Sequence, residues 1–271
     1  MKIETWLKSA TLQLQSADCS TPRLDAQILA CDTINCSKAW LLSHPEHVIN
    51  PGTVKKMNRY LKQRVNHIPI AYILGIKEFY GREFKLNRDV LVPRPESEAL
   101  IALALQITQP NLKVIDVGCG SGILGITLAL EKPDWNITLS DISPEAIQIA
   151  RQNTILHQIS SRVEFALQDL MREDRNDYDL AICNLPYVPD AMRHKIDLIA
   201  EPAIALYSGA EGLDHYTDLF SLLSQRTAKP RFVITESLES QHTLLSKLAR
   251  ESGYGLIQTA DLAQLYRPVA N

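Results

Sequence analysis

The second two thirds of the chain alternate short apolar segments with stretches of helical composition, and this alternation limits the fold more than any other feature. Five segments have the length and residue types of buried strands: KVIDV (113–117), NITLS (136–140), VEFAL (163–167), YDLAIC (178–183) and RFVITE (231–236). Helical stretches separate them, which is the pattern of β–α–β units. The sequence therefore predicts an α/β fold with a mostly parallel sheet and helices on both faces.

The first of these strands runs directly into a glycine-rich turn, DVGCGSGILGITLAL. Gly118, Gly120 and Gly122 permit a tight turn in which a ligand can approach backbone N–H groups, and the helix that follows directs its N-terminal dipole at the same place. Gly120, Gly122 and Gly125 also satisfy the G-x-G-x-x-G pattern. The loop alone therefore leaves a nicotinamide dinucleotide site open.

Polar side chains follow the next three strands. Asp141 ends the second strand, where a carboxylate can accept hydrogen bonds from two ribose hydroxyls. Asp169 and Leu170 follow the third strand, and Asn184 ends the fourth. Because open α/β sheets bind ligands at the carboxyl ends of their strands, we expect these residues and the glycine loop to line one site.

The first 75 residues have a different texture, and we predict a helical domain there. TPRLDAQILACDTI offers Thr21 as an N-cap and Pro22 at the first helical position. SKAWLLSH has the pattern of a short helix, and PGTVKKMNRYLKQRV that of a third with basic residues on one side. Alternating aromatic and polar residues in KEFYGREFKLNRDVLV predict a β-hairpin. The predicted organisation is a helical domain (1–75), a hairpin linker (76–92) and an α/β domain (93–271).

The charge distribution and the composition indicate which class of partner and which cellular compartment fit this chain. Residues 1–85 carry 12 Lys and Arg against 7 Asp and Glu, a net charge of +5, whereas the remainder carries 16 against 24, a net charge of −8. A basic first part favours a negatively charged partner, RNA or an acidic protein surface, and is equally typical of a solvated helical face. With no run of 18 apolar residues and a charged N-terminus, we expect neither a membrane span nor a signal peptide. Five cysteines without a C-x-x-C pair indicate reduced thiols in a cytoplasmic protein and no metal site.

The fourth strand ends in NLPY, Asn184 to Tyr187, a group that a dinucleotide site has no reason to contain. It resembles the [DNS]-P-P-[YFW] motif of amino and amide methyltransferases, and the glycine loop with Asp116 and Asp141 resembles the cofactor half of a class I methyltransferase. Upstream, IPIAYILGIKEFYGREFKLNRDVLVPRPESEALI is very similar to the linker of the PrmC/HemK family, the glutamine methyltransferases of peptide chain release factors. TPRLDAQILA is similar to that family's N-terminal domain, and EPAIALYSGAEGLDHY and DLAQLYR to its C-terminal blocks.

This resemblance implies a class I S-adenosylmethionine methyltransferase fold, Rossmann-like with a mostly parallel sheet, preceded by an N-terminal helical substrate-docking domain and a β-hairpin linker. It implies S-adenosyl-L-methionine as the cofactor. The implied activity is methyl transfer to the side-chain amide nitrogen of the glutamine in the Gly-Gly-Gln motif of a release factor. The release factor would be a protein partner in the cytoplasm, with no membrane, nucleic acid or metal required.

The resemblance also places site residues at the matching positions of this sequence. Cofactor contacts are expected from Asp116, Gly118, Cys119, Gly120, Ser121, Gly122, Asp141, Asp169, Leu170 and Asn184. Substrate contacts are expected from Asn184, Leu185, Pro186 and Tyr187, of which Asn184, Pro186 and Tyr187 are the expected catalytic residues. For Arg94, Glu96, Glu201 and Glu236, contact with the site and a purely structural role both stay open.

The motif has a chemical rationale. An amide nitrogen is a poor nucleophile because its lone pair is delocalised into the carbonyl. Two acceptors on the NH₂ hydrogens, the side-chain oxygen of Asn184 and the backbone carbonyl of Leu185, can turn the lone pair toward the methyl donor and favour the positive charge that develops. Pro186 stiffens the turn, and Tyr187 offers a flat face to a planar substrate. No strong base is required, since the proton becomes acidic only after transfer.

Two positions differ from the family pattern. Leu185 stands where the family usually has proline, and Leu170 where it often has an aromatic residue near the adenine. Since NLPY also resembles the motif of rRNA adenine dimethyltransferases, an adenine amino-methyltransferase acting on RNA or DNA is one alternative. A binding module that keeps the cofactor site without catalysis is another.

Overall fold

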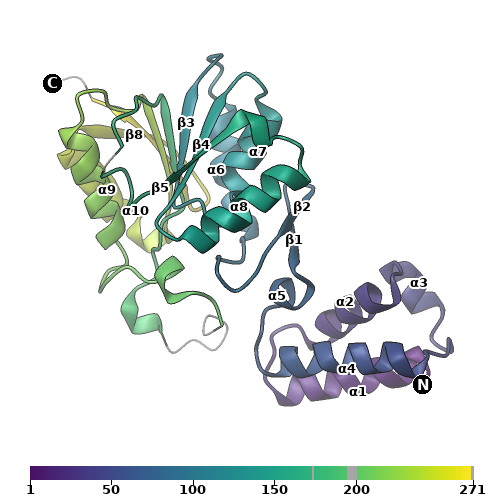
Figure 1. Ribbon diagram of the computed structural model, residues 1–271. Coiled ribbons are helices and arrows are strands. Elements are labelled where there is room, and N and C mark those ends of the chain that lie inside the picture. The colour runs from purple at the N-terminus through teal and green to yellow at the C-terminus, as the bar shows by residue number, and fades with distance from the viewer. Residues whose placement is uncertain (173, 194–199, 270–271) are drawn as a thin grey trace. The chain divides into compact units, whose positions relative to one another are not determined.

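The chain folds into two compact units, Met1–Gly75 and Ile76–Asn271, in a computed structural model that describes residues 1–172, 174–193 and 200–269 (Figure 1). Each unit has a hydrophobic core of its own. Within the described residues, no helix has the length and apolar character that a membrane span needs.

The first unit consists of helices. These are α1 (Ile3–Ser16), α2 (Pro22–Ile34), α3 (Lys38–Ser43), α4 (Pro51–Val65) and α5 (Ile70–Leu74). The three helices predicted from the sequence are present, with Pro22 and Pro51 at the first positions of α2 and α4. Thr21 precedes α2 as predicted, but its hydroxyl does not cap the helix backbone, because it donates to Asp25 Oδ1 at 2.7 Å instead.

A hairpin opens the second unit. Strands β1 (Ile76–Phe79) and β2 (Arg82–Lys85) pair antiparallel, as the sequence predicts. Tyr80 and Gly81 form the turn with φ of 50° and 70°, the conformation of a two-residue hairpin turn. Asn153 of α8 (Pro144–Leu156) fixes β2 to the rest of the unit, since its amide accepts from the Lys85 N–H at 2.7 Å and donates to the Lys85 carbonyl at 3.1 Å.

The second unit is built on a seven-stranded sheet with the order β5-β4-β3-β6-β7-β9-β8 (Figure 1). Its strands are β3 (Lys113–Val117), β4 (Asn136–Asp141), β5 (Val163–Leu167), β6 (Leu180–Cys183), β7 (Phe232–Glu236), β8 (Tyr254–Ala260) and β9 (Ala263–Pro268). Strands β3 to β7 are parallel, which confirms the predicted sheet. The antiparallel pair β8 and β9 at one edge was not predicted.

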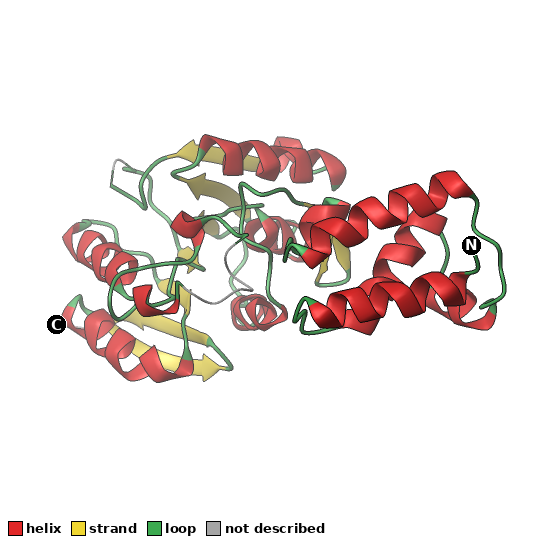
Figure 2. Ribbon diagram, turned by 90° about the horizontal axis from the view of Figure 1, so that it is seen from below, coloured by secondary structure: helices red, strands yellow, loops and turns green. Residues whose placement is uncertain are grey.

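Helices cover both faces of this sheet, as Figures 1 and 2 show. Helices α6 (Glu98–Leu105), α7 (Ile123–Glu131) and α8 pack on one face, and α9 (Asp214–Gln225) and α10 (His242–Glu251) on the other. Successive strand residues point to opposite faces of the sheet. Val114 therefore packs in the core on the side of α6, α7 and α8, and Ile115 in the core on the side of α9 and α10. Both are fully buried, which explains why the strands are continuous apolar runs.

Two ion pairs in the first unit differ in burial and predict different effects on stability. Arg64 Nε donates to Asp25 Oδ2 at 2.6 Å, and these side chains are 10% and 5% exposed. Lys56 and Asp32 are 3.6 Å apart and 42% and 31% exposed.

Asp25→Ala should lower the free energy of unfolding by about 3–5 kcal/mol, because Arg64 stays buried without its partner. Asp32→Ala, the matched control, should lower it by at most about 1 kcal/mol. Urea unfolding measures both, and equal losses would contradict the prediction.

Candidate active site

A pocket opens at the carboxyl edge of the sheet, where the sequence predicts the site. Its wall includes ten of the predicted residues: Gly118, Cys119, Gly120, Ser121, Asp141, Asp169, Leu170, Asn184, Leu185 and Pro186. Asp116, Gly122 and Tyr187 are not part of the wall. The strand ends therefore meet as predicted, and these three residues take other positions.

Asp116 lies beneath the glycine loop, with 1% of its surface exposed. Its Oδ2 accepts from the Gly125 N–H at 2.8 Å, in the first turn of α7. Gly125 has no room for a side chain, since a Cβ there would lie 2.3 Å from Leu139 Cδ2. Burial raises the pKa of Asp116 to about 7, against the lowering effect of the Gly125 N–H and with a smaller increase from Asp141. Asp116 therefore fixes the end of β3 to the first turn of α7, and its contact with a cofactor stays a prediction.

Asp141 ends β4 in the pocket wall. Its Oδ2 accepts from the Gly120 N–H at 2.8 Å and its Oδ1 from the Ser143 N–H at 2.9 Å. Burial raises the pKa of this carboxyl, and the backbone N–H groups that it accepts from lower it. Each carboxylate oxygen has a second lone pair, so Asp141 can hold the glycine loop and also accept from the hydroxyls of a ligand.

The glycine loop is held from its other side by Asn153, which is fully buried. The same amide that pairs with Lys85 donates from Nδ2 to the Ser121 carbonyl at 2.9 Å. Gly118, with a φ of 71°, leaves little room above the loop, because a Cβ there would lie 3.0 Å from Leu185 Cδ2. The hairpin, the loop and the turn after β6 are thus packed together.

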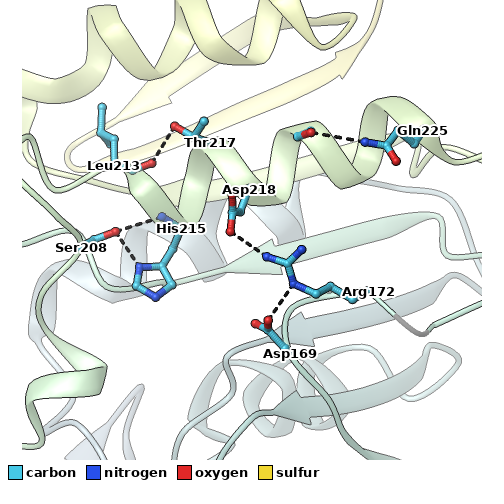
Figure 3. A network of polar contacts seen from close by, with 9 residues as sticks. Asp169, Arg172, Ser208, Leu213, His215, Thr217, Asp218 and Gln225 are labelled. Atoms are coloured by element: carbon cyan, nitrogen blue, oxygen red, sulfur yellow. Dashed lines mark hydrogen bonds and ion pairs between the residues drawn. The ribbon is translucent and has the colours of Figure 1, made fainter.

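Asp169 and Leu170 follow β5 in the pocket wall. Arg172 joins this segment to α9, since its Nε donates to Asp169 Oδ2 and its Nη2 to Asp218 Oδ2, both at 2.7 Å (Figure 3). All three side chains are about half exposed, so each ion pair contributes little by itself. Leu170 is buried and has a φ of 51°, which is uncommon for a residue other than glycine.

Asn184 follows β6 and has one occupied and one free polar atom. Its Nδ2 donates to Ser97 Oγ at 3.0 Å. Its Oδ1 is buried and has no hydrogen-bond partner in the part of the chain that the structure describes. Because a buried acceptor without a partner costs free energy, this oxygen is available to a ligand in the pocket.

The turn after Asn184 is held by Tyr216 of α9, whose side chain is fully buried. The Tyr216 hydroxyl accepts from the N–H groups of Leu185 at 3.3 Å and Glu236 at 3.2 Å. It also lies 3.1 Å from the Cys183 carbonyl and 2.5 Å from that of Glu236. Leu185 therefore uses an N–H group that proline would lack, which gives this departure from the family pattern a structural role.

Tyr187 lies behind the pocket wall. Its hydroxyl donates to Glu236 Oε1 at 2.9 Å, and its carbonyl accepts from Gln241 Nε2 at 2.8 Å. Burial, together with the charge of Glu236, raises the pKa of Tyr187 well above its ordinary value. The expected stacking of Tyr187 on a substrate stays a prediction.

Arg94 and Glu201 form an ion pair beside the pocket. The Glu201 side chain is 1% exposed and accepts from the Arg94 guanidinium and from the Val92 N–H, the latter at 2.9 Å. The pair joins the segment before α6, which contributes Pro93 to the pocket wall, to the segment after β6, which contributes Ile204. Glu201 is thus a structural acceptor, and Glu96 is exposed outside the wall.

The sequence predicted no role for some residues of the pocket wall, among them Ser97, Gln168 and His215. His215 Nδ1 lies 2.6 Å from Ser208 Oγ, which also accepts from the His215 N–H at 3.0 Å (Figure 3). Ser97 lies in the block VPRPESE, so the resemblance marked its segment but not its contact with Asn184, 87 positions away.

Comparison with known proteins agrees with this geometry. Residues 5–75 match the PrmC N-terminal domain, and residues 97–212 match the methyltransferase small domain. The release factor glutamine methyltransferase of Coxiella burnetii (strain RSA 493 / Nine Mile phase I) is 33% identical over 270 residues, which cover 98% of this chain and 97% of that protein. The chain belongs to the release factor glutamine methyltransferase family.

Other relatives support the same assignment. The release factor glutamine methyltransferase of Koribacter versatilis (strain Ellin345) is 36% identical over 221 residues, covering 79% of this chain and 78% of that protein. A methyltransferase from Pyrococcus furiosus of known crystal structure is 14% identical, with a TM-score of 0.50 and coverage of 77% of this chain and 95% of that one, which shows a shared fold alone. The predicted family and the class I methyltransferase fold are confirmed.

For this family member, Asp141→Ala should weaken the binding of S-adenosyl-L-methionine. The substitution removes the predicted acceptor for the ribose hydroxyls, and a hydrogen bond to a charged group contributes roughly 1.5–3 kcal/mol, so the Kd should rise by about ten- to a hundredfold. The matched control is Glu145→Ala, which removes an exposed carboxylate from the first turn of α8. Isothermal titration calorimetry measures both, and an unchanged Kd for Asp141→Ala would remove this residue from the cofactor site.

Asp116 should make the stability of the protein pH-dependent. Its raised pKa means that the folded state keeps a proton between about pH 4 and 7 that the unfolded state loses, so stability falls as pH rises through this range. The free energy of unfolding of the wild type, minus that of Asp116→Asn, should therefore increase by about 1.4 kcal/mol for each pH unit lowered from 7 toward 4. Denaturant titrations at several pH values measure this difference, and a difference that is flat with pH would be inconsistent with a protonated Asp116.

Proposed function

We propose that this protein transfers a methyl group from S-adenosyl-L-methionine to the side-chain amide nitrogen of the glutamine in the Gly-Gly-Gln motif of a peptide chain release factor. The observation that carries the proposal is the Oδ1 of Asn184, buried at the pocket and unpaired among the described residues. Such an acceptor fits an NH₂ group. Relatives matched over most of the chain are named for methylation of a release factor glutamine. The side-chain amide of that glutamine has such an NH₂ group.

The pocket has the groups that S-adenosyl-L-methionine requires. Asp141 offers carboxylate oxygens to the ribose hydroxyls, and the glycine loop brings its backbone into the wall from Gly118 to Ser121, which permits close approach of a ligand. Ile142 is 52% exposed in the wall and, with Leu170, offers apolar surface for the adenine ring. When bound, this cofactor supplies an electrophilic methyl group on a sulfonium.

The residues of the chain act on the substrate amide. Asn184 Oδ1 and the Leu185 carbonyl accept the two NH₂ hydrogens, which turns the nitrogen lone pair toward the methyl group. The same two oxygens favour the positive charge that develops on nitrogen as the new bond forms. The nitrogen then loses one proton to solvent, because the methylated amide cation is a strong acid. The neutral N-methylamide is the product.

The first unit is the part of the chain best suited to dock an acidic surface of the release factor. Lys55, Arg59 and Lys62 are exposed and spaced to share one face of α4. The remainder of the chain is net acidic, which disfavours close approach of nucleic acid phosphates to the pocket. We infer a protein substrate met in the cytoplasm, with no nucleic acid required.

Asn184→Ala should separate chemistry from cofactor binding. The substitution removes an acceptor that matters most as charge builds on nitrogen, so kcat should fall by about two to three orders of magnitude, by analogy with the loss of one oxyanion-hole donor. The Kd for S-adenosyl-L-methionine should change much less. Transfer of labelled methyl to purified release factor measures kcat, and near-normal turnover would reduce Asn184 to a structural residue at the strand end.

A further inference from the structure

Two hydrogen-bonded pairs of polar side chains lie at the pocket: Ser97 with Asn184, which are both in the wall, and Tyr187 with Glu236, which are not part of it. They come from three distant segments, since Ser97 precedes α6, Asn184 and Tyr187 follow β6, and Glu236 ends β7. Ser97 is 3% exposed and Glu236 is 1% exposed. A carboxyl buried to this extent needs hydrogen-bond donors around it, because burying it unpaired is costly.

The contact between Ser97 and Asn184 decides how the asparagine amide is oriented. An asparagine side chain has an acceptor on one side and a donor on the other, and a half-turn exchanges them. Here the nitrogen donates to Ser97 Oγ at 3.0 Å, which leaves the oxygen as the free atom. The reversed amide would direct its own hydrogens at those of a substrate NH₂ group, and this arrangement is repulsive.

Glu236 is a buried carboxyl that has one oxygen bonded to Tyr187 and one oxygen without a partner among the described residues. An ionised carboxylate only accepts, and the Tyr187 hydroxyl donates to its Oε1 at 2.9 Å. Burial raises the pKa of Glu236, and contacts with Ser97, Tyr187 and Asn184 oppose that increase. The other oxygen, Glu236 Oε2, is buried and has no hydrogen-bond partner among the described residues, so it is a free acceptor for the Ser97 hydroxyl. A Ser97 hydroxyl that turns its hydrogen to this oxygen has only lone pairs left for Asn184, so it must accept from the amide nitrogen.

The position of Ser97 is itself fixed. It ends the short turn Pro95–Ser97, directly after the segment that Glu201 holds through Val92 and Arg94. Its backbone N–H donates to the Arg94 carbonyl at 3.1 Å. The acceptor for Asn184 therefore follows directly on a segment that a buried carboxylate holds in place.

We propose that Ser97 and Glu236 are positioning residues: Glu236 accepts a hydrogen bond from the Ser97 hydroxyl, and Ser97 accepts one from the Asn184 nitrogen, so that the Asn184 oxygen is kept as acceptor for the substrate amide. Both act through Asn184. The inference rests on the proposed function, because it assigns the two residues a part in glutamine methylation.

Kinetics of matched variants test the role of Ser97. Ser97→Ala removes the acceptor, so kcat for methyl transfer to release factor should fall on the order of ten- to a hundredfold, with KM and the cofactor Kd close to those of the wild type. Ser97→Thr keeps a hydroxyl and should recover most of the rate. Ser237→Ala, the control, removes a buried hydroxyl next to Glu236 that has no partner among the described residues, and kcat should not change. Wild-type kcat in Ser97→Ala, or no recovery in Ser97→Thr, overturns the proposal.

Glu236→Gln tests the direction of these hydrogen bonds. A glutamine can donate to Ser97, which frees the Ser97 proton to point at Asn184 and favours the reversed amide. The value of kcat should therefore fall as in Ser97→Ala, again with the cofactor Kd retained. A Glu236→Gln enzyme with wild-type kcat would overturn the part of the proposal that concerns Glu236.

A second readout needs no substrate. In ¹⁵N-labelled protein, the Asn184 side-chain NH₂ should exchange hydrogen about tenfold faster in Ser97→Ala than in the wild type, because its hydrogen bond is lost, and slowly again in Ser97→Thr. Assignment follows from the signal missing in Asn184→Ala. Equal exchange in the wild type and Ser97→Ala overturns the positioning role. If the wild type transfers no methyl to release factor, the proposed function fails, and this measurement still decides how Asn184 is oriented.

Discussion

The parallel register of the central strands is the constraint on which the site depends. Val117 of β3 lies beside Ser140 of β4 and beside Cys183 of β6, so three segments far apart in the sequence leave the sheet at one edge. The Cys119 N–H donates to the Ser140 carbonyl at 2.9 Å, which continues the pairing into the glycine loop. The pocket thus follows from strand pairing before any side chain adds to it, as expected for the carboxyl edge of an open α/β sheet.

Buried polar side chains then fix the loops that this edge produces. Asp116 ties the end of β3 to the first turn of α7, and Asn153 ties the glycine loop to the hairpin. Tyr216 ties the ends of β6 and β7 together, and Glu201 ties the segment before α6 to the segment after β6. Each of these groups would cost free energy if left unpaired, so together they disfavour other loop positions. Asn184 Oδ1, in contrast, has no partner among the described residues, and we propose it as the acceptor for substrate.

Local patterns in the sequence predicted the parts of the structure that local physics determines. Apolar runs gave the five parallel strands, and the polar residues after them gave Asp141, Asp169 and Asn184 as neighbours in the pocket wall. Contacts between distant segments could not be predicted in the same way. Ser97 and Asn184 are 87 positions apart, and Tyr187 turns its hydroxyl to Glu236, 49 positions away. Because such pairings depend on the completed fold, the sequence left the roles of Glu201 and Glu236 open.

The central claim is that this site methylates a glutamine amide and not an adenine. The most direct test compares incorporation of labelled methyl from S-adenosyl-L-methionine into three substrates side by side. These are purified release factor, the same factor with the glutamine of its Gly-Gly-Gln motif replaced by alanine, and RNA with unpaired adenines. We expect label in the unmodified factor alone, located by mass spectrometry on the glutamine side chain. Incorporation into the RNA, or equal incorporation into the glutamine-replaced factor, would contradict it.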